Sequence, residues 1–290
     1  VFLVMDAIGA GNVITNRLKQ QVASATGIAP DNILFGQTHS HAGADLQGLW
    51  GGVPQDWIDT VLYPAAVSAV KKAQRNRCPA RLEVGQIAVP ELNNYRRPRV
   101  DPDAEADPTM TLLQARCAVG PEEGVVRASL LQYNAHPVGI GAGESPRVPH
   151  ADYILGAVER LEKNFGGVAL YFNGPIADAS TAGSATGNDT YERVRSRGEQ
   201  MAQRALDAPM RELAPTLSVR HREATLPVTN PLFVSVGALG AFNRYYDFLM
   251  LPLADIPFLG EQISFLPQIT PTASTVVSRV TLGGSQTGLE

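Results

Sequence analysis

The sequence has few charged residues for its length and no long hydrophobic run. Charged residues make up 18% of the 290 residues, and the formal net charge is −4. No run of about 18 apolar residues, the length that could cross a bilayer as a helix, occurs in it. The basic residues are scattered rather than clustered, so no positive surface for a nucleic acid backbone is indicated. We therefore expect a globular protein with no membrane span and no nucleic acid partner.

Cysteine is also scarce. Cys78 and Cys117 are the only two, and their spacing matches no metal or redox motif. They could form one disulfide in an exported protein or remain as two buried thiols, and the sequence favours neither state. A thiolate metal site is not expected, so any metal ion must be held by other side chains.

The order of the predicted elements favours an α/β fold. Strands are expected at 1–5, 32–37, 81–89, 125–133, 168–172, 217–227 and 275–282, and helices at 13–25, 55–73, 153–164 and 191–206. Early alternation of strand and helix is typical of βαβ units around a mostly parallel or mixed sheet flanked by helices. Ligands of such sheets gather at the carboxyl ends of the strands, where we expect the functional site.

Residues 1–290 are interpreted as a single catalytic domain that is incomplete at both ends, because the first and last predicted strands lack closing elements. The start reads as a buried strand rather than a signal peptide. Residues 97–108, rich in Pro and Asp, are expected to form a loop. The Pro-rich apolar stretch at 249–272 could line a groove for an apolar substrate, or could be a loop packed on the core.

Histidines stand at two of the predicted strand ends. Thr38-His39-Ser40-His41 follows the second strand, and His136 follows the strand at 125–133. On an extended backbone residues i and i+2 face the same way, so both imidazoles of the pair can reach one ion, or one can bind it while the other carries a proton. Imidazoles from separate strand ends are the usual beginning of a catalytic zinc site. The third ligand is open, with Asp6, Asp178 and a segment beyond residue 290 as candidates.

Small residues dominate the segment 173–183, which follows a third strand. A turn rich in Gly and Ala brings backbone N–H groups close to a ligand, where they can stabilise an oxyanion. Ser180 would then face the same rim as the histidines. The alternative is a flexible polar loop without a catalytic role.

These segments together resemble the catalytic domain of the neutral and alkaline ceramidases, over residues 1 to about 187. Thr38-His39-Ser40-His41 is similar to the family's Thr-His-Thr-His segment, the residues around His136 to its second histidine segment, and Asp178-Ala179-Ser180 to its Asp-x-Ser motif. The resemblance implies that His39 and His136 bind zinc, and that His41 and Ser180 contact the substrate or take part in catalysis.

The resemblance also implies an arginine that contacts the substrate. Arg96 and Arg97 are both candidates, and Arg97 is favoured because it directly precedes Pro98. The implied activity is that of a zinc-dependent amidohydrolase in sphingolipid metabolism that cleaves an N-acyl lipid such as ceramide. A secreted or periplasmic location follows from the same resemblance, with a membrane surface as a further candidate partner. The oligomeric state is not indicated.

Departures from the family pattern leave two other functions open. Thr181-Ala182 follows Ser180 where the family has Pro-Asn, and Asp45 and Trp50 would reshape the entrance. The family's remaining zinc ligands have no match before Glu290, so a chain that stops there is expected to hold zinc weakly. The alternatives are a related hydrolase of another amide or ester, and a metal- or lipid-binding module without activity.

The two remaining histidines are expected to be dispensable. His221 is expected to face solvent on a late strand, and His150 precedes a helix. Asp152, rather than His150, is the residue of that segment expected near the site.

Overall fold

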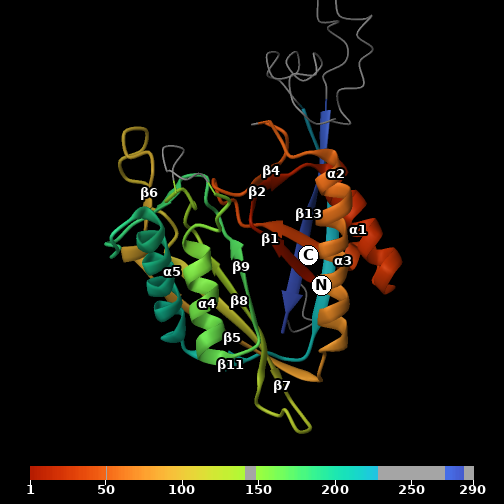
Figure 1. Ribbon diagram of the computed structural model, residues 1–290. Coiled ribbons are helices and arrows are strands. Elements are labelled where there is room, and N and C mark those ends of the chain that lie inside the picture. The colour runs from red at the N-terminus through yellow and green to blue at the C-terminus, as the bar shows by residue number, and fades with distance from the viewer. Residues whose placement is uncertain (50, 141–147, 228–271, 284–290) are drawn as a thin grey trace, which may run out of the picture.

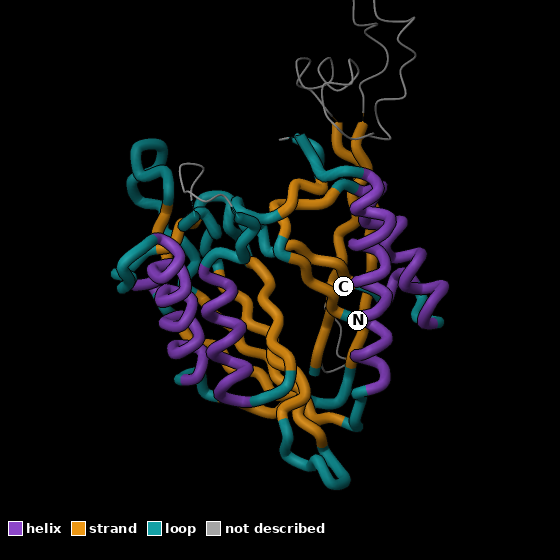
Figure 2. The backbone as a smooth tube through the Cα atoms, in the orientation of Figure 1, coloured by secondary structure: helices purple, strands orange, loops and turns teal. Residues whose placement is uncertain are grey.

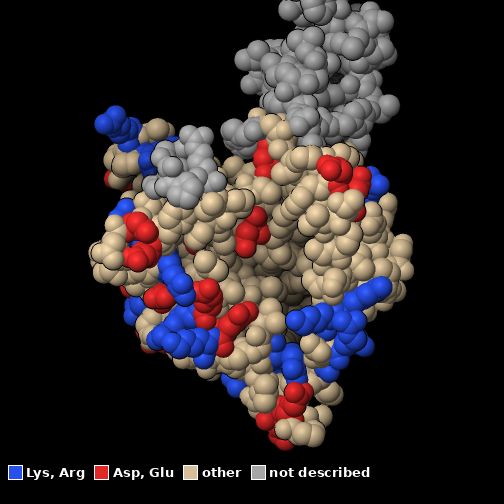
Figure 3. Space-filling view, in the orientation of Figure 1, with Lys and Arg blue, Asp and Glu red and all other residues tan. Residues whose placement is uncertain are grey.

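The computed structural model describes residues 1–49, 51–140, 148–227 and 272–283, and most of these residues form two α/β halves (Figure 1). The first half contains β1 (Phe2–Met5), β2 (Ala7–Ala10), α1 (Asn12–Thr26), β3 (Leu34–Gln37), β4 (Ala44–Leu46), α2 (Gln55–Trp57) and α3 (Tyr63–Arg75). The second half contains β5 (Ala80–Ala88), β6 (Asn93–Tyr95), β7 (Thr109–Cys117), β8 (Val126–Tyr133), α4 (Tyr153–Phe165), β9 (Val168–Asn173), β10 (Ala179–Thr181), α5 (Thr190–Leu206) and β11 (Met210–Glu212). Figure 3 shows that the surface between the halves is hollowed on the face in view.

The first half is built from two short parallel strand pairs, β1 with β3 and β2 with β4. Helix α1 buries Leu18 and Val22 at helical spacing and ends at Gly27, whose φ of 74° is the left-handed conformation that glycine adopts most easily. These side chains pack with Ile33 and Tyr63 in a hydrophobic core that belongs to this half. The strand ends before His39 and His41 are therefore held by a core of their own.

The second half contains a five-stranded sheet in the order β11-β5-β7-β8-β9. Helices α4 and α5 cover one face of this sheet (Figure 2). Leu112 of β7, Leu131 of β8 and Tyr171 of β9 meet Leu161 of α4 and Met201 of α5 in a second core. The end of β8, which leads to His136, is thus held by a different set of apolar side chains.

The predicted α/β class, with a mixed sheet flanked by helices, is confirmed. The alternative of a mostly parallel sheet is wrong for the larger sheet. Only β8 and β9 pair in parallel there, and the pairs of β11 with β5, β5 with β7 and β7 with β8 are antiparallel. The cause is β7, a strand that the pattern did not predict, which returns between β5 and β8 after the 97–108 loop. Gln114 is buried in β7, and this polar residue interrupts the apolar face that would have indicated a strand.

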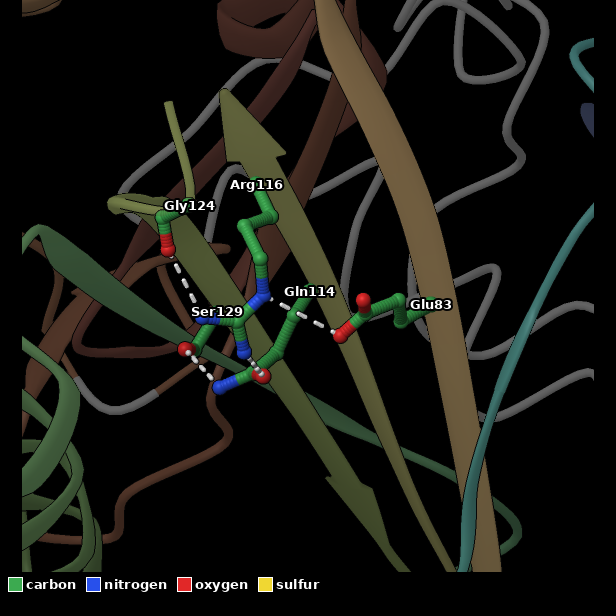
Figure 4. Close-up of polar contacts among 5 residues, drawn as sticks. All are labelled: Glu83, Gln114, Arg116, Gly124 and Ser129. Atoms are coloured by element: carbon green, nitrogen blue, oxygen red, sulfur yellow. Dashed lines mark hydrogen bonds and ion pairs between the residues drawn. The ribbon is translucent and has the colours of Figure 1, made fainter. Parts of the chain in front are cut away.

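A polar network accommodates that buried glutamine. The amide nitrogen of Gln114 donates to the Ser129 hydroxyl at 3.1 Å, and its oxygen accepts from Arg116 at 3.2 Å (Figure 4). Arg116 also reaches Glu83 at 3.2 Å and the Gly124 carbonyl at 2.8 Å. The network connects β5, β7 and β8, so the buried polar groups have partners and the sheet keeps its register.

Cys78 and Cys117 form a disulfide, which settles the alternative that the sequence left open. It connects the segment before β5 to the end of β7. A long ribbon of β12 (Leu217–Pro227) and β13 (Thr272–Leu282) follows the second half in the chain. The imidazole of His221 lies on this ribbon, where its Nδ1 contacts the Ser278 hydroxyl at 2.8 Å and its Nε2 the Asp31 carbonyl at 2.6 Å.

Among the described residues, no helix is both long enough and apolar enough to cross a membrane. The Pro-rich stretch up to residue 271, Trp50 and Glu290 lie outside the described residues.

Candidate metal centre

The structure brings the imidazoles of His39, His41 and His136 together. One ring nitrogen from each lies within 4.8 Å of the other two, and the Nε2 atoms of His41 and His136 are 3.0 Å apart. His39 and His41 follow β3 of the first half, and His136 follows β8 of the second. The group therefore spans the two halves, and its three nitrogens are close enough to bind one ion.

His39 has a strained backbone that aims its ring. Its φ is 61°, a region that non-glycine residues rarely adopt, and its backbone N–H donates to the Ala7 carbonyl at 3.0 Å. The ring Nδ1 lies 2.6 Å from the Ile8 carbonyl oxygen, so Nδ1 carries the proton and donates. The lone pair is therefore on Nε2, and a backbone carbonyl at the other nitrogen is the usual arrangement for a histidine that binds a metal.

His136 has two competing partners at Nδ1. The Ile176 carbonyl oxygen lies at 3.0 Å and needs a proton on Nδ1, whereas Arg96 Nη1 lies at 2.7 Å and can only donate. One ring nitrogen cannot serve both partners at once. Metal binding through Nε2 requires the proton on Nδ1, so the bond to Ile176 belongs to the tautomer that binds metal and the contact with Arg96 to the other.

Charge states in the group favour metal binding at neutral pH. Burial lowers the pKa of His136 to about 4, although its bond to the Ile176 carbonyl opposes the shift, and the nearby His39 and Arg96 lower it further. Burial is also the main cause of a lowered pKa for His41. Both rings are therefore neutral near pH 7, which is the form that binds a metal ion.

Buried tyrosines support the backbone before His136. The Tyr153 hydroxyl lies 2.5 Å from the Ala135 carbonyl oxygen and 2.9 Å from the Tyr171 hydroxyl. Tyr171 donates to the Tyr133 carbonyl at 3.0 Å. Helix α4 and strand β9 thus hold the end of β8 through side chains that have no access to water.

Direct contacts join the two halves beside the histidines. Asn173 Nδ2, at the end of β9, donates to the Thr38 carbonyl at 2.6 Å, and the backbone N–H of His41 donates to the Pro137 carbonyl at 3.1 Å. These bonds fix the β3 end against the ends of β8 and β9, so the spacing of the three rings depends on both halves.

The other predicted site residues lie at different distances from this centre. Ser180, in β10, is bridged to His136 in parallel, and the adjacent Ala179 carbonyl accepts from the His136 N–H at 3.0 Å. Arg97, the favoured arginine, forms an exposed ion pair with Asp178 at 3.1 Å. Arg96, the second candidate, is the one whose guanidinium contacts His136. The structure thus favours Arg96 for a role in the site.

The acidic candidates for a third ligand have other partners. Asp6 accepts from the Thr38 hydroxyl at 3.0 Å, and burial raises the pKa of its carboxyl group. Asp178 pairs with Arg97. Within the described ranges, the grouping of ligand atoms that could hold a metal consists of His39, His41 and His136. Three imidazole nitrogens suit zinc, so the residues present fit the ion, with His41 able to supply the third nitrogen.

No protein-family model and no curated protein matches the sequence. Among solved structures, the chain is similar to the neutral ceramidase from Pseudomonas aeruginosa, with a TM-score of 0.70 and 15% identity over 97% of this chain and 52% of that one. A ceramidase complexed with C2 gives a TM-score of 0.63 and 16% identity over 77% of this chain and 38% of that one. The chain has the ceramidase fold. It spans about half the length of the first of these structures and less of the second.

The fold also brings to the centre a residue that the sequence did not single out. Ser40 is fully buried between His39 and His41, and its hydroxyl donates to the His150 carbonyl at 2.6 Å. Asp152, which was expected near the site from the sequence, is also buried. No local pattern could have shown these contacts, because the bond between Ser40 and His150 joins residues 110 positions apart.

Proposed function

We propose that this chain is the catalytic part of a zinc-dependent hydrolase that cleaves the amide bond of an N-acyl lipid such as ceramide. The observation that carries the proposal is the convergence of three histidines, two of them with lowered pKa values, at strand ends of a ceramidase fold. The neutral ceramidase from Pseudomonas aeruginosa and the ceramidase complexed with C2 supply the reaction class and the substrate class.

His39 and His136 are the proposed zinc ligands, because a backbone carbonyl lies beside Nδ1 of each ring and leaves Nε2 to bind. Zinc supplies a Lewis acid that polarises a carbonyl oxygen and lowers the pKa of water. His41 is the most exposed of the three rings. With its lowered pKa it is neutral at pH 7, so it can accept a proton and then donate it to the leaving amine.

Arg96 and Ser180 are the proposed groups for the oxyanion of the tetrahedral intermediate. The guanidinium of Arg96 lies 2.7 Å from Nδ1 of His136, and the tautomer that binds metal carries a proton there, which frees the guanidinium to donate to a bound carbonyl. Ser180 lies on the strand that pairs with both His136 and Asn94. Hydrogen-bond donors fixed in this way act mainly on the transition state.

A secreted or periplasmic location is part of the proposal. The disulfide between Cys78 and Cys117 supports it, because such bonds persist in oxidising compartments and are rare in the cytosol. A lipid substrate would also bring the protein to a membrane surface.

A related hydrolase of another amide or ester is the second candidate. Asp45 accepts from the backbone N–H groups of Gln47 at 3.0 Å, Gly48 at 2.8 Å and Gly52 at 3.1 Å. The carboxylate therefore fixes a tight loop shortly after His41, and that loop can restrict which substrates enter.

The test is turnover of a fluorogenic N-acyl lipid by zinc-loaded protein, with the matching ester and a short-chain amide assayed in parallel. We expect turnover of the lipid amide to stop on chelation and to return with zinc. Preference for the short amide or the ester would favour the second candidate. Absence of turnover of all three by zinc-loaded, folded protein would indicate a binding module.

Zinc content separates the roles of the histidines. We expect His39→Ala and His136→Ala to lose the ion and His41→Ala to retain most of it while losing turnover. Equal loss of zinc from all three variants would instead make His41 the third ligand.

A further inference from the structure

Asp152 is a buried acid with an unusual backbone conformation close to the histidine centre. Its side chain is 1% exposed and its φ is 60°. In the described part of the chain, His39 is the other non-glycine residue with a positive φ. Such conformations persist where the surrounding structure fixes them, and they concentrate at functional sites. The contacts of Asp152 explain what fixes it.

The carboxylate of Asp152 does more than cap α4. An ordinary cap accepts a hydrogen bond from the second or third residue of the helix. Asp152 instead accepts from the backbone N–H of Tyr153, the first residue, at 2.7 Å, and from the N–H of Ile140 at 2.9 Å. Its second oxygen thus connects the start of α4 to the segment that leads away from His136.

The backbone of Asp152 reaches the other side of the centre. Its N–H donates to Nδ1 of His150 at 2.9 Å. The main chain of His150 then bonds to both neighbours of His41: its carbonyl accepts from the Ser40 hydroxyl at 2.6 Å, and its N–H donates to the Ala42 carbonyl at 3.0 Å. His150 therefore holds the short turn that carries His41.

These bonds close a circuit through the centre. From Asp152 one arm runs through residues 137–140 to His136, and the other runs through His150 to His41. The circuit closes where the His41 N–H meets the Pro137 carbonyl at 3.1 Å and the two Nε2 atoms face each other at 3.0 Å. The carboxylate belongs to the first arm, and the backbone N–H of the same residue begins the second.

We infer that Asp152 is a positioning residue for the histidine centre, which sets the spacing of His41 and His136 without touching substrate or metal. The inference deepens the proposed function and rests on it for the identity of the ion. It also changes the expectation for His150, which acts in this circuit as the connection to His41 rather than as a dispensable residue.

The test compares Asp152→Asn with Asp189→Asn. Asparagine has the size of aspartate and tolerates a positive φ, but it leaves one of the two backbone N–H groups without an acceptor. Asp189 is the matched control, because it caps the neighbouring helix α5 by accepting from Glu192 N–H at 2.8 Å and is exposed. Zinc affinity is measured by competition with a chelator, and folding by circular dichroism and thermal melts.

We expect Asp152→Asn to bind zinc about 10- to 100-fold more weakly, the range typical of residues that orient metal ligands, and Asp189→Asn to bind zinc as wild type does. Unchanged zinc affinity in folded Asp152→Asn would overturn the inference. If Asp152→Asn does not fold, Ser40→Ala is measured in its place, because it removes the hydrogen bond to His150 in the other arm. Ser40→Thr, which keeps a hydroxyl, is the rescue variant. A zinc affinity of folded Ser40→Ala equal to that of wild type would also overturn the inference.

A measurement on metal-free protein separates this inference from the proposed function. The imidazole NMR signals of His41 and His136 are expected to shift in Asp152→Asn and to stay in place in Asp189→Asn. If wild type binds no zinc but these signals shift, the proposed function fails and the positioning role stands. If the signals do not shift, the positioning role fails whether or not zinc binds.

Discussion

Two buried hydroxyls beside the centre have too few protons for their contacts. Tyr153 and Tyr171 have one hydroxyl proton each, yet their oxygens make three close contacts: with the carbonyl of Ala135, with the carbonyl of Tyr133 and with each other. Burial raises the pKa of both phenols, so neither ionises. At most two of the three contacts are hydrogen bonds at any moment, and the two carbonyls are the better acceptors.

This count predicts that Tyr153→Phe costs more stability than Tyr171→Phe. Without the Tyr153 hydroxyl, the buried Ala135 carbonyl keeps no hydrogen bond among the described residues, which costs about 1–3 kcal/mol. Without the Tyr171 hydroxyl, the Tyr133 carbonyl still accepts from the Gly174 N–H at 3.1 Å. The second change should therefore cost about 0.5–1.5 kcal/mol, the net value of one ordinary hydrogen bond.

The free energy of unfolding of the two variants is measured by urea denaturation with disulfide-intact protein. Equal slopes against urea are required, so that the difference reflects the folded state. Zinc affinity should fall in Tyr153→Phe and not in Tyr171→Phe, because Ala135 directly precedes His136. A Tyr171→Phe cost equal to or above that of Tyr153→Phe would refute the proton count and the assignment of the Tyr153 proton to Ala135.

Three further predictions concern the pH dependence, the disulfide and the serine of the site. In metal-free protein the imidazole of His136 should stay neutral down to about pH 4, whereas in the unfolded chain it takes a proton near pH 6.5. The contribution of His136 to stability is therefore present above pH 6.5 and is lost as the pH falls toward 4. An NMR titration midpoint near 6.5 for His136 in the folded protein would contradict this prediction. Replacing Cys78 and Cys117 together by serine should lower the free energy of unfolding, measured by urea denaturation, by about 4 kcal/mol, because the bond closes a loop across a separation of 39 residues in the unfolded chain. A loss below about 1 kcal/mol would show that the bond does not constrain the unfolded chain. Ser180→Ala should slow turnover by about 10²-fold at unchanged zinc content, while activity within a few-fold of wild type would leave Ser180 a structural role only.

Hydrophobic periodicity predicted most helices and strands to within a few residues, because the apolar residues of the helices and of β1, β3, β5, β8 and β9 face one of the two cores. The helix expected at 55–73 shows where the pattern was too coarse: a π-helical turn at Ile58–Leu62 separates α2 from α3. Pro64, at the start of α3, has no N–H for the hydrogen bond of a regular turn, and the wider turn accommodates it. Periodicity cannot show this, since the apolar face continues through the turn.

The site was predictable to the extent that its residues stand at strand ends. His39, His41 and His136 could be named because polar residues directly follow apolar strands, and ends of strands meet at one rim. The contact of Arg96 with His136 could not, since Arg96 and Arg97 are neighbours in an irregular segment whose path determines which side chain turns inward. The circuit through Asp152 is likewise invisible in sequence, because its bonds join residues far apart in the chain.

The position of the histidines between two hydrophobic cores has a consequence for how the protein assembles. Each half can bury its own apolar side chains, but the three imidazoles approach one another only after the halves have docked. An ion bound there would act as a crosslink, and its binding free energy would be added to the docking of the halves rather than to the folding of either one. Zinc would therefore bind after the halves have docked, and its removal would weaken their docking, which the bonds of Asn173 and His41 across the halves still support, without unfolding either core.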